Sequence, residues 1–346
     1  MKAVLGAGKS QFLWEVCGHE KIVNYLKSSI LNRRVSHAYV FAGPKHLGKH
    51  AVALKFIKTL YCQNQDGYRP CGECPACRQV ESQSHPDIYR LKKIINNKTG
   101  KWFQEIGIDQ IRDLKVKLSQ GTLLKSWKVA IIDEAETLNE NSANSLLKVL
   151  EEPTAQTVII LIASDISRLP KTILSRSLVL NFLSVRREEI RDFLLSREIG
   201  EDKAERISRL SLGRPGLAVS LSEDNDYFSV VKKQMDDFLK LLSESPAERL
   251  KDLSGLLDFE KDEALNIIKL DRLLDNWQTA LRDVILLKNY NEVNLSGIRT
   301  NQQSNELRQL PWAKILKIDL LISGAKKSTD MNISSKNVLE NLVINL

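Results

Sequence analysis

The segment at residues 43–50, GPKHLGKH, differs at one position from the phosphate-binding loop pattern G-x-x-x-x-G-K-[ST]. In such a loop the glycines let backbone N–H groups surround the phosphates, the lysine neutralises their charge, and the last hydroxyl binds Mg²⁺. Gly43, Gly48 and Lys49 fit this pattern, whereas His50 replaces the hydroxyl with an imidazole, a poor ligand for Mg²⁺. We therefore expect ATP with Mg²⁺ to bind weakly or not at all, and a strand-to-helix turn that binds nothing fits the segment equally well.

An acidic pair follows the apolar run 129–132, as at the end of a Walker B strand. In an active ATPase the first carboxylate, here Asp133, holds Mg²⁺, and the second, here Glu134, polarises the attacking water. Two acids that merely end a strand are the simpler interpretation. The phosphate-loop pattern upstream favours a nucleotide-binding fold instead.

Four cysteines, Cys62, Cys71, Cys74 and Cys77, are spaced as C-x₈-C-x₂-C-x₂-C. Four thiolates can close a tetrahedral Zn²⁺ site that leaves no open position for chemistry. An iron–sulfur cluster shares part of this spacing, but its next cysteine would fall at Glu81. Disulfides are disfavoured in the cytosol. The spacing therefore predicts a structural zinc site.

The elements that would position these residues begin with short, continuous apolar runs. Continuous rather than alternating runs, separated by helical patterns, are typical of a parallel sheet covered on both faces. A helix is expected at 49–62 after the loop, and another where Ala143, Leu146, Leu147 and Leu150 form one apolar stripe. The expected strands are 38–42, 88–91, 129–132, 158–163 and 178–182.

After residue 182 the pattern becomes helical. We predict three domains: an α/β P-loop domain at 1–182 with a zinc module at about 62–77, a small helical domain at 183–224, and an all-α domain at 225–346. A polar break near residue 224 marks the second boundary. The expected helices are 186–196, 202–211, 214–222, 226–243, 246–255, 260–288, 303–323 and 333–345.

The composition suits a globular protein with several cores. The 346 residues are 42% hydrophobic and carry a net charge of +8, which is compatible with a nucleic-acid partner. The chain has no uninterrupted apolar run of membrane-spanning length, and its first residues lack the apolar stretch of a secretory signal. We expect a cytoplasmic protein.

Together these features resemble the clamp-loader branch of the AAA+ proteins, from about residue 16 to about residue 218. The resemblance implies an AAA+ domain, a helical lid domain and a C-terminal collar domain. It also implies a role in loading the sliding clamp of the replicative DNA polymerase III onto primed DNA. The segments that carry it are SHAYVFAGP at 36–44, the cysteine insertion, IDQIR at 108–112, DEAE at 133–136, NSLLKVLEEP at 144–153 and LPKTILSRS at 169–177.

The resemblance also assigns roles to single residues. Arg176 matches the arginine of the family's Ser-Arg-Cys motif, which reaches the ATP of a neighbouring subunit, although Ser177 departs from the cysteine. Ser164 falls at the first sensor position. ATP-hydrolysing relatives carry an arginine where this chain has Gly216. Together with His50, this difference implies that the chain does not hydrolyse ATP itself.

The partners implied by the resemblance are other AAA+ loader subunits of the gamma/tau and delta types, the sliding clamp and primer-template DNA. They would form a hetero-pentamer in the cytoplasm, at the replisome, without a membrane. Two other functions are weighed. An active ATPase motor of the gamma/tau type would need a hydroxyl at His50 and an arginine at Gly216. A stand-alone zinc protein that binds DNA would need a DNA-reading motif, and none is recognised.

Overall fold

The computed structural model describes residues 11–64, 68–93, 105–122, 127–289, 307–330 and 333–346. The chain forms two compact units. The first contains the described parts of Met1–Ile94 and Glu105–Arg186 together with Arg214–Gly216, and the second contains those of Arg187–Gly213 and Leu217–Leu346. The division into three domains at residues 182 and 224 remains a prediction.

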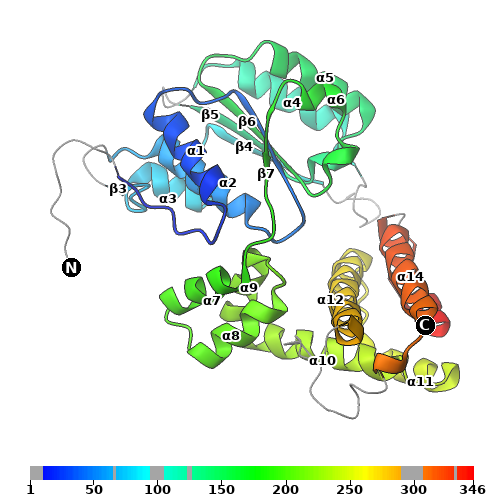
Figure 1. Ribbon diagram of the computed structural model, residues 1–346. Coiled ribbons are helices and arrows are strands. Elements are labelled where there is room, and N and C mark those ends of the chain that lie inside the picture. The colour runs from blue at the N-terminus through cyan, green and yellow to red at the C-terminus, as the bar shows by residue number, and fades with distance from the viewer. Residues whose placement is uncertain (1–10, 65–67, 94–104, 123–126, 290–306, 331–332) are drawn as a thin grey trace. The chain divides into compact units, whose positions relative to one another are not determined.

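The first unit is built on a five-stranded sheet in the order β4-β5-β6-β2-β7, and all neighbouring strands are parallel (Figure 1). The predicted strands are confirmed. β2, β5 and β6 are buried along their whole length, which explains their continuous apolar runs. The strands are β2 Ala38–Ala42, β4 Ile88–Leu91, β5 Lys128–Ile132, β6 Thr157–Ala163 and β7 Leu178–Asn181.

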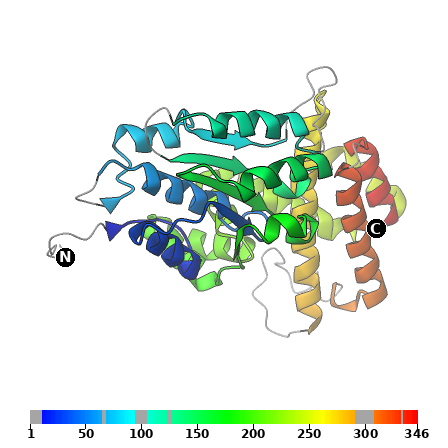
Figure 2. The ribbon, with the colours of Figure 1, turned by 90° about the horizontal axis from the view of Figure 1, so that it is seen from above.

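Helices cover both faces of this sheet (Figures 1 and 2). Alternate side chains of β2 divide between the two layers, as the period of a strand requires. Tyr39 and Phe41 pack in the core on one face, and Ala38, Val40 and Ala42 in the core on the other. The first layer contains α1 Glu20–Leu31, α2 Lys49–Tyr61 and α3 Pro75–Glu81, and the second contains α4 Ile108–Ser119, α5 Glu140–Glu151 and α6 Lys171–Leu174.

Four short elements complete the first unit. β1 Gln11–Phe12 and β3 Tyr68–Arg69 form a separate parallel pair beside the cysteine insertion. Single 3₁₀ turns follow two strands of the main sheet: η1 Ala135–Thr137 comes after β5, and η2 Ile166–Arg168 after β6. Both turns therefore lie just after the carboxyl ends of their strands, at the side of the sheet that we call the carboxyl edge.

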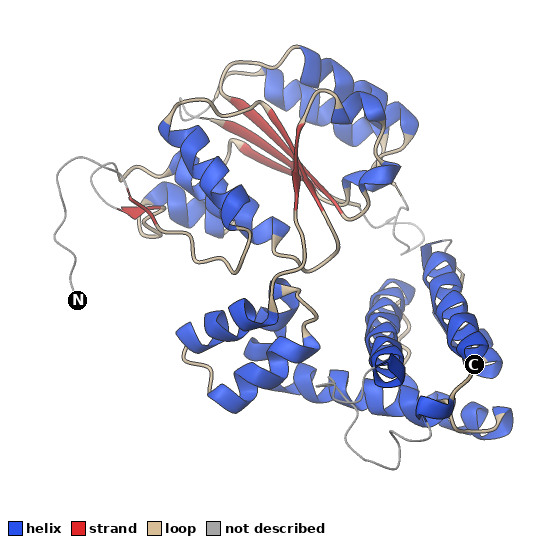
Figure 3. Cartoon of the chain, in the orientation of Figure 1, coloured by secondary structure: helices blue, strands red, loops and turns tan. Residues whose placement is uncertain are grey.

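In the described residues of the second unit the regular elements are all helices (Figure 3). Its core includes Phe238 and Trp277, whose ring centroids lie 5.1 Å apart. Part of the helix expected at 303–323 lies outside the described residues, and α14 begins after Pro311. The helices are α7 Arg187–Ser196, α8 Glu201–Leu210, α9 Pro215–Glu223, α10 Asn225–Leu241, α11 Pro246–Leu256, α12 Glu263–Asn289, α14 Trp312–Asp330 and α15 Ser335–Asn345; the first two residues of α9 belong to the first unit.

Across the described ranges, no helix is long and apolar enough to cross a membrane.

Candidate functional site

The phosphate-loop segment connects β2 to α2, and its two glycines are required by the backbone. At Gly43, φ is 141°, and a Cβ would lie 2.3 Å from the carbonyl oxygen of Phe182. Gly48 is the N-cap of α2 with φ 86°, a left-handed conformation that favours glycine. Both glycines that the pattern requires therefore also have a structural reason at these positions.

Lys49 is directed back into this loop. Its side chain is 5% exposed, and its Nζ donates hydrogen bonds to the carbonyl oxygen of Pro44 at 2.7 Å and to that of Gly43. Burial lowers the pKa of Lys49 to about 8, while the charge of Glu136 opposes the shift. The ammonium group that would neutralise a phosphate is thus bound to carbonyl oxygens of the loop itself.

The loop is also closed by the first turn of α9. The amide of Gly216 donates a hydrogen bond of 2.8 Å to the carbonyl oxygen of His46. A Cβ at Gly216 would lie 2.8 Å from the same oxygen, closer than real Cβ contacts. A side chain at this position, such as the arginine that the sequence resemblance implies for an active ATPase, therefore has no room here.

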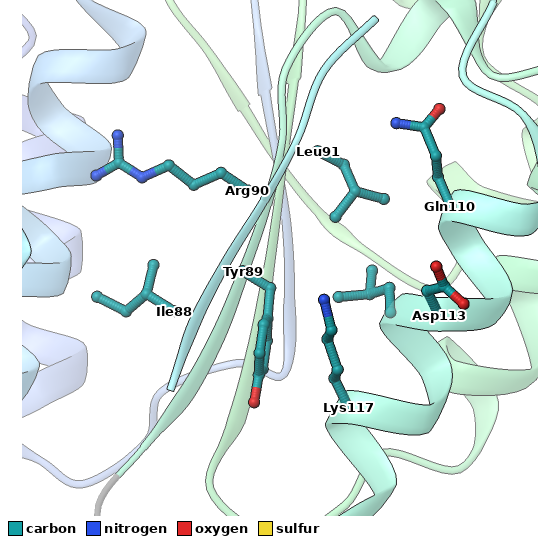
Figure 4. Close-up of a pocket in the computed structure, with 8 residues that line it drawn as sticks. Ile88, Tyr89, Arg90, Leu91, Gln110, Asp113 and Lys117 are labelled. Carbon is teal, nitrogen blue, oxygen red and sulfur yellow. The ribbon is translucent and has the colours of Figure 1, made fainter. Parts of the chain in front are cut away.

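Asp133 lies near two nitrogen-bearing side chains of its own chain, His50 and Arg90. Burial raises its pKa, and the charges of His50 and Arg90 oppose the rise. Burial also lowers the pKa of Arg90, and Asp133 opposes that shift. Figure 4 shows Arg90 on the side of β4 away from Tyr89 and Lys117. An imidazole and a guanidinium thus lie near the carboxylate that would hold Mg²⁺ in an active ATPase.

The other two acids of the motif point in different directions. Glu134 has a left-handed backbone (φ 50°, ψ 47°), and its carboxylate pairs with Lys93 at 2.9 Å. Glu136 instead accepts a hydrogen bond of 3.0 Å from the amide of Ser164, the residue at the predicted first sensor position. Glu136 has no role among the residues predicted from the sequence. A 3₁₀ helix has three residues per turn, so a residue three positions after Asp133 returns to the same side of the chain. This spacing was the signal that could have identified Glu136.

The predicted site residues lie at opposite edges of the sheet. The phosphate loop, Asp133 and Ser164 follow the carboxyl ends of β2, β5 and β6, which are neighbouring strands. Arg176 precedes the amino end of β7, whose Leu178 pairs in register with Tyr39 near the start of β2. The length of β2, about 13 Å at ~3.3 Å per residue, therefore separates Arg176 from its own loop.

Arg176 is partly exposed and bound to two elements of its own unit. Its Nη2 pairs with Oε1 of Glu151 at 2.7 Å, and 37% of its side chain is exposed. Its Nη1 donates to the carbonyl oxygen of Thr172 at 3.2 Å and to Oγ of Ser175 at 3.3 Å. The guanidinium is held at the surface and is not buried in a core.

The four cysteines converge as predicted. Their sulfur atoms all lie within 4.8 Å of one another, and the Sγ atoms of Cys71 and Cys77 are 4.0 Å apart. A tetrahedral Zn²⁺ with bonds of about 2.3 Å would place its sulfur ligands about 3.8 Å apart. The amides of Cys71, Cys74 and Cys77 donate to the sulfurs of Cys62, Cys71 and Cys74, at 3.4, 3.4 and 3.5 Å. Amide donors of this kind stabilise thiolates, so the cluster fits a metal ion.

A shallow pocket of about 300 Å³ lies elsewhere, between β4 and α4 (Figure 4). It contains none of the predicted site residues. Its lining is formed by Ile88, Tyr89, Arg90, Leu91, Gln110, Asp113, Leu114 and Lys117.

A family of known proteins matches the part of the chain that carries these features. The family model described as "DNA polymerase III, delta subunit" matches residues 18–186. This range includes the loop, the cysteines and Arg176.

Three subunits of DNA polymerase III are similar to this chain. The DNA polymerase III subunit delta' of Bacillus subtilis is 29% identical over 333 residues, which cover 94% of this chain and 95% of that protein. The subunit delta' of Pseudomonas aeruginosa is 40% identical over 41% of each chain. The subunit tau of Bacillus subtilis is 35% identical over 47% of this chain and 27% of its own length. The chain thus spans less than two thirds of the last two relatives.

Proposed function

We propose that this chain, which belongs to the family of DNA polymerase III delta-prime subunits, supplies Arg176 to the ATP of a neighbouring subunit and hydrolyses none itself. Its relatives indicate a subunit related to the clamp loader of DNA polymerase III. In our proposal the amino edge of the sheet supplies Arg176, and the loop edge hydrolyses no ATP.

The observation that carries the proposal is the position of Arg176. It lies at the amino edge of the sheet, opposite the phosphate loop, with its guanidinium at the surface. Such an arginine is too far from its own loop to act there and is accessible to another molecule. A planar guanidinium that always carries a charge suits the stabilisation of phosphoryl charge in a transition state.

Four features of the loop edge support the absence of ATP hydrolysis by the chain itself. His50 supplies no hydroxyl for Mg²⁺. Lys49 binds loop carbonyls, Glu134 binds Lys93, and Gly216 leaves no space for a sensor arginine. Each feature removes a different part of the machinery, so one substitution would not restore it.

The partners are part of the same proposal. A trans-acting arginine requires an ATP-binding neighbour, and subunits of the gamma/tau type, which are among the relatives, are the natural candidates. Loading would further involve the sliding clamp and primer-template DNA, within a cytoplasmic hetero-pentamer. The helical second unit would contribute the collar.

The proposal is tested with Arg176→Ala in the complex assembled with its ATPase subunits. ATP turnover at the site that Arg176 completes should fall by about 10³-fold, the lower range for an arginine finger. The purified chain with Mg²⁺ and primed DNA should show no turnover. Unchanged ATPase and clamp loading in the Arg176→Ala complex would refute the assignment. Turnover by the chain alone would favour the alternative of an active motor subunit.

We further propose that the cysteine cluster holds one structural Zn²⁺. The purified chain should contain about one zinc per molecule by metal analysis, and Cys74→Ser should lose it and lower the melting temperature. Cys17→Ser is the matched control, since Cys17 is buried outside the cluster, and it should keep the metal. Zinc retained at full stoichiometry in Cys74→Ser would contradict the assignment.

A further inference from the structure

The guanidinium of Arg176 has a carboxylate partner from a different helix. Oε1 of Glu151, the last residue of α5, lies 2.7 Å from its Nη2. Nη1 is directed instead at the C-terminal end of α6, through Thr172 and Ser175. The two ends of the guanidinium fork are therefore fixed by two separate helices, which determines the direction in which its remaining N–H groups point.

The place of Glu151 on α5 is unfavourable for the helix itself. The C-terminus of a helix carries partial negative charge, so a carboxylate in the last turn is repelled and a cation is favoured there. Arg176 supplies that cation from outside the helix. The adjacent Glu152, also exposed, makes no ion pair with Arg176 in the described part of the chain.

We propose that Glu151 is a positioning residue for Arg176, holding the guanidinium ready for the phosphate of a neighbouring subunit's ATP. The inference depends on the proposed function, because it assumes that Arg176 acts in trans. A long arginine side chain loses rotamer freedom when it is fixed, and the ion pair with Glu151 removes part of that freedom before the neighbour arrives.

The geometry leaves the guanidinium able to act while it is held. Arginine has five N–H donors, and the contacts of the described residues use the two on Nη1 and one on Nη2. The donors on Nε and the second one on Nη2 remain for phosphate oxygens. An exposed ion pair is weak, so Arg176 can still adjust its position while it is paired with Glu151.

The test measures ATP turnover in the assembled complex with Glu151→Gln. The kcat of the DNA-stimulated ATPase should fall about two- to five-fold, the range of an exposed ion pair, with the KM for ATP unchanged. Glu152→Gln removes the same charge one residue away and should leave kcat unchanged. Glu151→Asp, which keeps the carboxylate on a shorter side chain, should recover part of the loss.

A double variant separates this inference from the function that it assumes. In the Arg176→Ala background, adding Glu151→Gln should cause no further loss, because the residue it positions is gone. If Arg176→Ala lowers turnover but Glu151→Gln leaves it unchanged or raises it, the positioning role is refuted and the arginine finger stands. If Arg176→Ala itself has no effect, the proposed function fails.

Discussion

The two edges of the sheet have opposite relations to the AAA+ pattern. At the carboxyl edge the glycines of the phosphate-loop pattern are kept, while the side chains that would bind nucleotide contact their own chain: Lys49 binds loop carbonyls and Glu134 binds Lys93. At the amino edge Arg176 is partly exposed and forms an ion pair with Glu151 at the surface. The charged groups of the loop edge thus contact their own chain near the sheet, whereas the guanidinium at the amino edge remains accessible.

This difference indicates which parts of a nucleotide-binding fold depend on nucleotide. The loop glycines are needed by the backbone, since Gly43 avoids a clash with the carbonyl of Phe182. They can therefore persist without a ligand. Arg176 is partly exposed and held by surface contacts alone, so packing gives it no comparable structural reason, which agrees with the proposal that it acts on a partner.

The largest contrast between the edges is expected in the ATPase of the assembled complex. Where Arg176→Ala costs about 10³-fold at the completed site, Lys49→Met at the loop edge should change turnover by less than about two-fold. Both variants would be measured in the same complex with primed DNA. Equal losses from the two variants would mean that this chain's own loop takes part in hydrolysis, and the comparison would fail.

Most of the fold was predictable because its signals are local. The three fully buried strands appear as continuous apolar runs, and the helix with the stripe at Ala143 and Leu146 ends at Glu151, two residues before Pro153. The order of the strands was not predicted, because pairing between strands distant in the chain leaves no local pattern. Arg176 is separated from the phosphate loop because it precedes β7, whereas the loop follows β2, and the two strands are parallel neighbours.

The candidate site was predictable in its residue types but not in its contacts. The cysteine spacing predicted convergence, since a metal tetrahedron requires it, and the sulfurs do converge. The pairing of Glu134 with Lys93 was not predictable, because it depends on a left-handed backbone at Glu134. Glu151 belonged to a segment that carried the family resemblance, yet its contact with Arg176 required the structure.

The burial of Lys49 should make stability depend on pH. Its pKa in the folded chain is about 8, against an ordinary value of 10.5. Between these pH values the unfolded chain binds more protons than the folded one, so folding becomes more favourable as the pH rises. At about 1.4 kcal/mol per unit, this contribution is about 3 kcal/mol. Urea denaturation at pH 7.5 and 10.5 gives the free energy of unfolding of wild type and Lys49→Met. The change with pH in the difference between the two proteins measures this contribution, because the other lysines are present in both and cancel. A difference that does not change with pH would show that the ammonium group is solvated.

The contact that closes the loop edge should be sensitive to a single methyl group. Gly216→Ala places a Cβ 2.8 Å from the backbone oxygen of His46, which cannot move aside as a flexible side chain would. The free energy of unfolding should fall by about 1 to 3 kcal/mol, as for other overpacked sites. Gly121→Ala is the matched control in the same unit, because its Cβ would meet nothing within 4 Å. If both variants unfold at the same urea concentration, the contact between Gly216 and the backbone of His46 is not tightly packed. The missing sensor arginine would then need an explanation other than lack of space.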